Sequence, residues 1–258
     1  MSSTNTGLDA FASAFPLTTR VNLMRVAAPA RAGTPRAGIV RGRSWAEIAE
    51  AIARSQPGRS ADICVIRHGQ TTLNALHLIS GDADTELTRV GRLQAVEAGR
   101  QLAASGERFD LACSSHLQRS RETLAIICAA ADWDGVRVWS DPRLGERSLG
   151  ELERRPAKPI AAFEAGDLTW RPPGGESYAA VALRLYDFLV DLLEAPDTHC
   201  QRVLLCSHVG PMRLIMGMLN DETDAVEVMA YQLPNLAPLC FRAEDIRIPT
   251  YLLPIADR

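Results

Sequence analysis

The chain has 258 residues, of which 47% are hydrophobic and 23% charged, and its formal net charge is −3. This composition is ordinary for a globular protein, and the length suits one large α/β domain or a domain with an extension. Because the net charge is small, the overall charge of the chain does not indicate binding to nucleic acid or to an anionic membrane. We also expect no membrane span and no secretory signal, because no apolar run is long enough and no compact apolar core follows basic residues at the N-terminus.

Residues 1–60 predict a basic N-terminal extension that contains one helix. Six arginines precede residue 44, opposed by Asp9 alone. Such an arm is more often solvated than bound to nucleic acid, so we expect no nucleic-acid partner. Ser44–Glu47 predicts a capping box that opens a helix at about 44–54. Gln56–Ser60 predicts the loop that separates the extension from a main domain over 61–258. A lid, an added element or a homodimer contact are all open as roles for the extension.

The first strong strand signal is the apolar run 63–66, which is typical of a fully buried strand. The run ends at Arg67, His68 and Gly69, a cation, an imidazole and a turn residue. In open α/β sheets, ligands bind at the carboxyl ends of strands, where backbone N–H groups suit an anion. This segment therefore predicts a phosphate site with a nucleophile inside it.

Further strands alternate with helical patterns along the chain. The predicted strands are Asp110–Ser114, Val136–Ser140, Arg202–Ser207 and Leu239–Phe241, the last near a sheet edge. One predicted helix runs from Arg89 to about Ser105, and a second opens within Ser115–Thr123. Two more cover Tyr178–Glu194 and Met212–Leu219, and a short helical insertion lies within 156–170. This order favours an α/β fold of three layers, in which helices cover both faces of a mostly parallel sheet.

Three further polar positions are candidates for the same chemistry. His208 follows a buried strand, as His68 does, and two strand-end histidines are hard to explain as core packing. Arg119 opens a helix and can bind phosphate oxygens in a forked pair. Glu146 lies in the loop after the third strand and can protonate a leaving oxygen.

These motifs carry a family resemblance. Arg67–Asn74 resembles the signature of the histidine phosphatase superfamily, the phosphoglycerate-mutase-like enzymes. Arg119, Glu146 and His208 match further family positions in the family's order. The resemblance covers roughly residues 62 to 245, and it implies the phosphoglycerate-mutase-like fold and phosphoryl transfer.

The resemblance implies a mechanism. Neutral His68 attacks phosphorus to form a phosphohistidine, and Glu146 first protonates the leaving oxygen and then activates water. The groups that hold the phosphoryl oxygens are Arg67, Arg119, protonated His208 and Asn74. We expect neither a metal nor a cofactor, because the set meets each need of the reaction and no acidic cluster of the two-metal type is apparent.

The substrate rim departs from the family. Phosphoglycerate mutases commonly have tyrosine where Leu149 stands, and many members have glycine where Arg154 stands. We predict Arg147 and Arg154 as rim residues. A cluster of Arg154, Arg155 and Lys158 either clamps a second anionic group or is a solvated charge run.

The stretch from Gly150 to Pro173 is shorter than the insertion of known mutases. We therefore predict a phosphomonoesterase for a small phosphorylated metabolite. A phosphoglycerate-type phosphomutase is the alternative, and a non-catalytic binding protein with this fold is the second alternative.

The six cysteines lie mostly in apolar, strand-like runs without a C-x-x-C pair, which argues against a zinc site or a redox dithiol. They are Cys64, Cys113, Cys128, Cys200, Cys206 and Cys240. We expect all six to be reduced core residues of a cytoplasmic protein.

Overall fold

The computed structural model describes residues 42–55, 61–194 and 202–253. The chain divides into two units, Met1–Ala30 and Arg31–Arg258, and every described residue belongs to the second. Most of the predicted basic arm and the predicted boundary loop Gln56–Ser60 lie outside the described residues.

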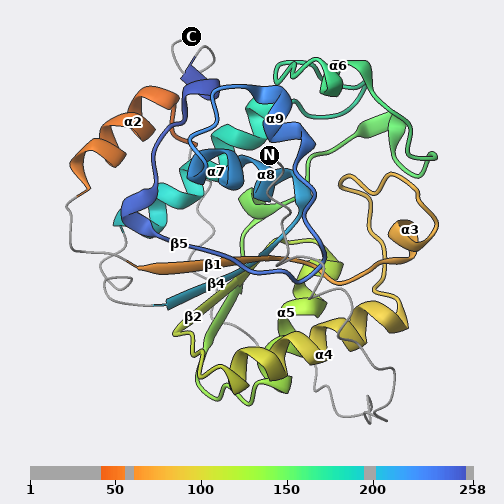
Figure 1. The fold of residues 1–258 in the computed structure, drawn as a ribbon, viewed down its shortest axis with the longest axis vertical. Coiled ribbons are helices and arrows are strands. Elements are labelled where there is room, and N and C mark those ends of the chain that lie inside the picture. Colours follow the sequence, from red (N-terminus) through yellow and green to blue (C-terminus); the bar gives the residue numbers. More distant parts are fainter. Residues whose placement is uncertain (1–41, 56–60, 195–201, 254–258) are drawn as a thin grey trace, which may run out of the picture. The chain divides into compact units, whose positions relative to one another are not determined.

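The centre of the fold is a sheet in the order β3-β2-β4-β1-β5 (Figure 1). Its strands are β1 (Asp62–Arg67), β2 (Leu111–Ser114), β3 (Arg137–Ser140), β4 (Arg202–Ser207) and β5 (Leu239–Arg242). All neighbours pair in parallel except β5, which runs antiparallel along β1 at the edge. Each strand lies within a residue or two of its prediction, and the predicted mostly parallel α/β architecture is confirmed.

Helices cover both faces of the sheet. α4 (Arg89–Ala104) and α5 (Gln118–Ala130) lie on one face, and α7 (Tyr178–Glu194) and α8 (Val209–Leu219) lie on the other (Figure 1). Ile63 and Val65 of β1 enter the core shared with α7 and α8, whereas Cys64 and Ile66 are buried on the opposite face. Burial on both faces is why β1 is a continuous apolar run. No helix within 42–55, 61–194 and 202–253 is long and apolar enough to cross a bilayer.

The predicted helix of the extension is confirmed as α2 (Trp45–Arg54), and it belongs to the main core. Ser44 and Glu47 form the predicted capping box. Ile48 is completely buried in the cluster that also contains the apolar face of α7. Burial of one isoleucine side chain contributes roughly 1.5–3 kcal/mol, so this contact fastens α2 to the domain.

The remaining helices follow their local signals. Thr88 caps α4 by accepting from Gly91 N, as predicted. α7 has the predicted bounds and buries the predicted stripe of Val181, Leu185, Phe188, Leu189 and Leu192. α8 begins three residues before the predicted Met212, because Pro211 fits the first turn of a helix, where its missing N–H costs nothing. The insertion within 156–170 contains the short helix α6 (Ala161–Glu164). The short helices α3 (Thr72–Ala75) and α9 (Ala225–Ala230) complete the α-helices of the described part.

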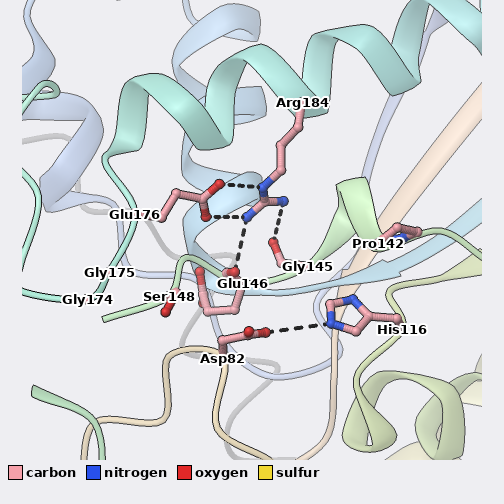
Figure 2. Close-up of a pocket in the computed structure, with 10 residues that line it drawn as sticks. All are labelled: Asp82, His116, Pro142, Gly145, Glu146, Ser148, Gly174, Gly175, Glu176 and Arg184. Atoms are coloured by element: carbon pink, nitrogen blue, oxygen red, sulfur yellow. Dashed lines mark hydrogen bonds and ion pairs between the residues drawn. The ribbon is translucent and has the colours of Figure 1, made fainter. Parts of the chain in front are cut away.

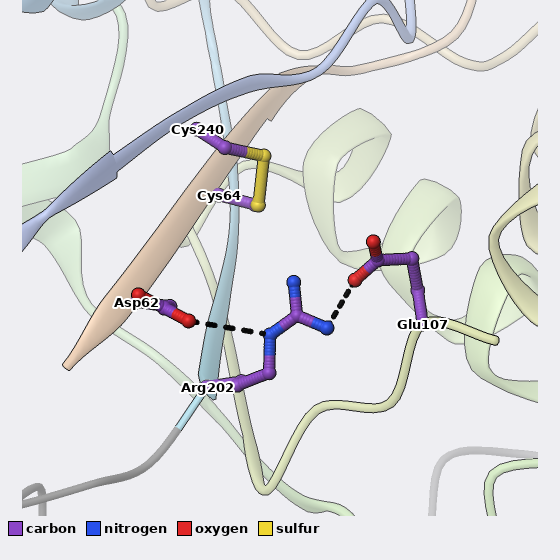
Figure 3. The surroundings of a disulfide bond; sticks show 5 residues. All are labelled: Asp62, Cys64, Glu107, Arg202 and Cys240. Carbon is purple, nitrogen blue, oxygen red and sulfur yellow. Dashed lines mark ion pairs between the residues drawn. A yellow bond between two sulfur atoms is a disulfide. The ribbon is translucent and has the colours of Figure 1, made fainter. Parts of the chain in front are cut away.

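The prediction that all cysteines are reduced is wrong for two of them. Cys64 and Cys240 form a disulfide between β1 and β5 (Figure 3). They face each other directly in the antiparallel register, with Cα atoms 4.1 Å apart, and closely spaced antiparallel partners bring side chains into contact. Cys113, Cys128 and Cys206 are free, and Cys200 lies outside the described residues.

Candidate active site

The two strand-end histidines lie next to each other. β1 and β4 are adjacent and in register, with Arg67 opposite Ser207, so the residue that follows each strand starts at the same edge of the sheet. The imidazole centroids of His68 and His208 are 5.0 Å apart, and the residues are 3% and 0% exposed. Both rings can therefore contact one tetrahedral anion.

The backbone fixes which nitrogen of His68 can react. Its Nδ1 lies 2.8 Å from the carbonyl oxygen of Gly69. A carbonyl can only accept, so Nδ1 carries the proton and Nε2 keeps its lone pair. Burial, followed by the charges of Arg119 and Arg67, lowers the pKa of His68 well below 6.5. His68 is therefore a neutral nucleophile near neutral pH.

His208 is held by Ser115, to which the sequence analysis assigned no role. Its Nε2 lies 2.6 Å from Ser115 Oγ, and its buried Nδ1 has no partner among the described residues. Burial and the charges of Arg119 and His68 lower the pKa of His208 well below 6.5. Burial and the neighbouring positive charges thus favour neutral His208, whereas an anion bound beside it would offset these charges and favour the protonated form that we expected.

Two desolvated guanidinium groups border the histidines. Arg67 Nη1 donates to Leu233 O at 2.9 Å. Arg119, which is 1% exposed, donates to Ala83 O at 2.8 Å and to Gly81 O at 2.7 Å. The buried Nε atoms of both arginines have no protein partner within the described ranges. Burial lowers the pKa of both side chains. Desolvated cations with unused N–H donors favour the binding of an anion.

Glu146 approaches the same place from the loop that follows the 3-10 helix Pro142–Leu144. Its carboxylate accepts from Arg147 N at 2.8 Å and from Gly210 N, in the first turn of α8, at 3.2 Å. Its charge favours the protonated states of Arg67 and Arg119. The two arginines and the carboxylate therefore share one electrostatic environment.

Glu146 also borders a cavity of about 360 Å³ (Figure 2). The other lining residues are Asp82, His116, Pro142, Gly145, Ser148, Gly174, Gly175, Glu176 and Arg184. His116 is exposed, as expected for a surface residue, and it also lines this cavity, with Nε2 3.7 Å from Asp82 Oδ1. The cavity has the size of a small-molecule site.

Asn74 has a capping function in the ligand-free site. Its Oδ1 accepts from Thr71 N and its N–H donates to Thr71 Oγ1, both at 3.3 Å. These bonds form a capping box at the start of α3. The phosphate contact of Asn74 stays a prediction.

Of the two predicted rim residues, the structure leaves one at the surface. Arg147 is 2% exposed, donates from Nε to Glu176 O at 2.6 Å, and lies over aromatic rings. Those rings belong to Phe163, Trp170 and Tyr178. Arg147 is therefore enclosed inside the protein, because the rings cover its guanidinium group, and is not on the rim.

Arg154 is exposed and donates to Asp84 O at 3.1 Å, beside the loop that Arg119 binds. Its φ of 62° lies in the left-handed region. This conformation accounts for the glycine of many relatives, because glycine adopts it without the penalty of a Cβ.

Four further residues near the site were given no functional role by the sequence analysis. Asn235 Nδ2 donates to His68 O, and Leu236 N donates to Arg67 O at 3.0 Å. Ser115 lies four residues before Arg119, but its sequence context does not indicate the contact with His208. Arg184 could have been noticed, because it shares one helical face with Asp187 and is a charge within an apolar helix.

The family model described as "Histidine phosphatase superfamily (branch 1)" matches residues 63–246. The chain belongs to this superfamily. A 2,3-bisphosphoglycerate-dependent phosphoglycerate mutase of Nitrobacter winogradskyi is 31% identical over 189 residues, which are 70% of this chain and 90% of that protein.

Among solved structures, the chain is similar to a mycobacterial glucosyl-3-phosphoglycerate phosphatase complexed with VO3, with a TM-score of 0.58 and 26% identity over 72% of this chain and 95% of that one. It is also similar to the alpha-ribazole phosphatase of Shigella flexneri, with a TM-score of 0.58 and 26% identity over 69% and 89%. The superfamily thus includes both the mutase and the phosphatase reactions that we considered.

Proposed function

We propose that this histidine phosphatase superfamily member is a phosphomonoesterase that hydrolyses a small phosphorylated metabolite through a phosphohistidine. The observation that carries the proposal is the tautomer of His68, whose Nδ1–H donates to Gly69 O at 2.8 Å and leaves Nε2 free to attack. Arg67 and Arg119 supply positive charge beside it.

The reaction has two steps. In the first, Nε2 of His68 forms a bond to phosphorus, the bond to the leaving oxygen breaks, and protonated Glu146 gives that oxygen its proton. In the second, the Glu146 carboxylate takes a proton from water, which attacks phosphorus and releases His68 as the N–P bond breaks. Arg67 and Arg119 stabilise the negative charge on the equatorial oxygens in both steps, and the proposed reaction uses no metal.

Two observations favour hydrolysis over transfer to a second hydroxyl. The cavity beside Glu146 has room for water, and the structural relatives reported above carry phosphatase names. The length argument from Gly150–Pro173 is weaker, because the match covers 90% of a relative that carries the mutase name. That name and its 31% identity make phosphoglycerate mutase the second candidate.

The test combines phosphoenzyme trapping with product analysis. Incubation with a radiolabelled phosphomonoester and rapid acid-free quenching should label wild type, and His68→Ala should give neither label nor turnover. A His68→Ala protein with normal turnover would contradict the mechanism. A coupled assay in which 3-phosphoglycerate isomerises only when 2,3-bisphosphoglycerate is added would favour the mutase.

The non-catalytic alternative predicts phosphate binding without turnover across a broad panel of phosphomonoesters. A cytoplasmic location, a homodimer contact through the extension and the absence of nucleic-acid partners stay predictions. The Cys64–Cys240 disulfide argues against the cytoplasmic location, because disulfides are uncommon in reducing compartments.

A further inference from the structure

Arg184 of α7 binds the back of the loop that carries Glu146 (Figure 2). Its Nη1 donates to the carbonyl oxygens of Arg143 and Gly145 at 2.7 and 2.8 Å, and its Nη2 donates to Glu146 O at 3.0 Å. One guanidinium thus holds three carbonyls within four consecutive residues.

The opposite edge of this guanidinium is held by Glu176. Arg184 Nε and Nη2 donate to its two carboxylate oxygens at 2.9 and 3.0 Å. Glu176 is itself fixed, because its N–H donates to Ser148 O at 2.9 Å. One edge of the Arg184 guanidinium therefore binds the loop carbonyls, and another binds the Glu176 carboxylate. Because the guanidinium is planar and rigid, these contacts restrict movement of the loop.

The same face of α7 binds the loop at a second point. Asp187 and Asp191 accept from Arg143 at 2.9 and 2.7 Å. These residues follow Arg184 at i+3 and i+7, so all three project from one side of the helix. A helix of the core therefore adds two points of attachment to a loop that Asp141 and Ser207 also bind.

We propose that Arg184 is a positioning residue for the general acid. By fixing the peptides on both sides of Glu146, it determines where the carboxyl group lies relative to the leaving oxygen. This inference rests on the proposed role of Glu146. It differs from a purely structural role, in which Arg184 would affect folding and all substrates equally.

The chemistry of the leaving group separates the two roles. An alkoxide needs a proton as the P–O bond breaks, whereas nitrophenolate is stable without one. Misplacement of the acid should therefore slow the hydrolysis of alkyl phosphates and leave the hydrolysis of p-nitrophenyl phosphate nearly unchanged. The parameter to compare is kcat/KM, because it ends at phosphohistidine formation and excludes the second use of Glu146 as a base.

The experiment measures kcat/KM of the full-length chain for glycerol 2-phosphate and for p-nitrophenyl phosphate. We expect Arg184→Met to lose roughly 10- to 100-fold on the alkyl substrate, the scale of a misplaced acid, and less than about threefold on the aryl substrate. Arg184→Lys should restore little, because lysine has no planar fork. Equal losses on both substrates, or no loss on either, would overturn the inference.

Arg202→Met is the matched control. Arg202 is also a partly buried arginine with carboxylate partners, Asp62 and Glu107, but it lies at the amino end of β4 (Figure 3). Replacement of Arg202 should change kcat/KM for both substrates by the same factor. If Arg184→Met does not fold, Glu176→Gln replaces it, and it should give a smaller loss that is again confined to the alkyl substrate. Equal losses in Glu176→Gln would reject positioning.

Glu146→Gln separates this inference from the proposed function. If Glu146→Gln hydrolyses both substrates as wild type does, the assignment of the acid fails. If Glu146→Gln loses activity on the alkyl substrate only and Arg184→Met does not, the assignment of the acid stands and positioning by Arg184 is wrong.

Discussion

Replacement of Arg119 by lysine tests the phosphate site most directly. The substitution keeps one positive charge in a side chain that is 1% exposed. It removes the fork that reaches Gly81 O and Ala83 O at 2.7 and 2.8 Å, and the Nε that has no partner among the described residues. Lysine can occupy only part of this geometry.

The expected loss follows from the contacts. A hydrogen bond to a charged group contributes about 1.5–3 kcal/mol, and lysine should forfeit at least one such bond to the bound phosphate. At about 1.4 kcal/mol for each factor of ten, a loss of about 2–3 kcal/mol lowers kcat/KM roughly 30- to 150-fold. The loop containing Gly81 and Ala83 loses a fork partner too, so KM should rise with the fall in kcat.

The assay is kcat/KM for p-nitrophenyl phosphate together with the inhibition constants of phosphate and vanadate. Arg121→Lys is the control, because Arg121 is an exposed residue of the same helix. We expect Arg121→Lys to be within about twofold of wild type, as surface substitutions usually are. A folded Arg119→Lys protein with kcat/KM within threefold of wild type would refute the assignment of Arg119 to phosphate binding.

Three other predictions follow from the site and the sheet. Because burial and neighbouring arginines lower the pKa of His68 and that of His208, kcat/KM should fall only well below pH 6.5; an acid limb at or above 6.5 would contradict this. The free energy of unfolding should also decline as the pH falls below 6.5, since unfolded histidines take up protons first; melting curves measured against pH test the sign. Reduction of the Cys64–Cys240 disulfide should lower the free energy of unfolding by about 2–5 kcal/mol and give two more titratable thiols. An unchanged melting temperature after verified reduction would contradict this stabilising role. Ser115→Ala removes the partner that lies 2.6 Å from His208 Nε2. We therefore expect the free energy of unfolding to fall by about 1–3 kcal/mol and kcat/KM to decrease. Unchanged values of both quantities would contradict this role of Ser115.

The sheet could be predicted because its strands are short apolar runs that end in turn or charged residues. The same signal located the site, since His68 and His208 each follow such a run. Their 5.0 Å approach required only that β1 and β4 be neighbours in register. Local sequence was therefore sufficient wherever a residue's position depends on the end of a strand.

Features that depend on pairing between distant segments were not predictable. The partners Cys64 and Cys240 are separated by 176 residues, and only the antiparallel register of β5 brings them together. Arg147 resembles a rim residue in sequence, but the aromatic rings that enclose it come from residues up to 31 positions away, ending at Tyr178. The contact of Arg184 with the loop that carries Glu146 likewise joins a helix and a loop that are far apart in the sequence.

The supports of Glu146 and of His68 differ in part. His68 follows a strand of the central sheet, whereas the loop of Glu146 is bound to α7 through Arg184 as well as to the end of β4 through Ser207. Sequence drift in the mouth segments can therefore alter which alcohol is accommodated without disturbing the atom that attacks phosphorus. Such modularity gives a physical reason why one scaffold can diversify among many phosphate esters while its core chemistry is inherited unchanged.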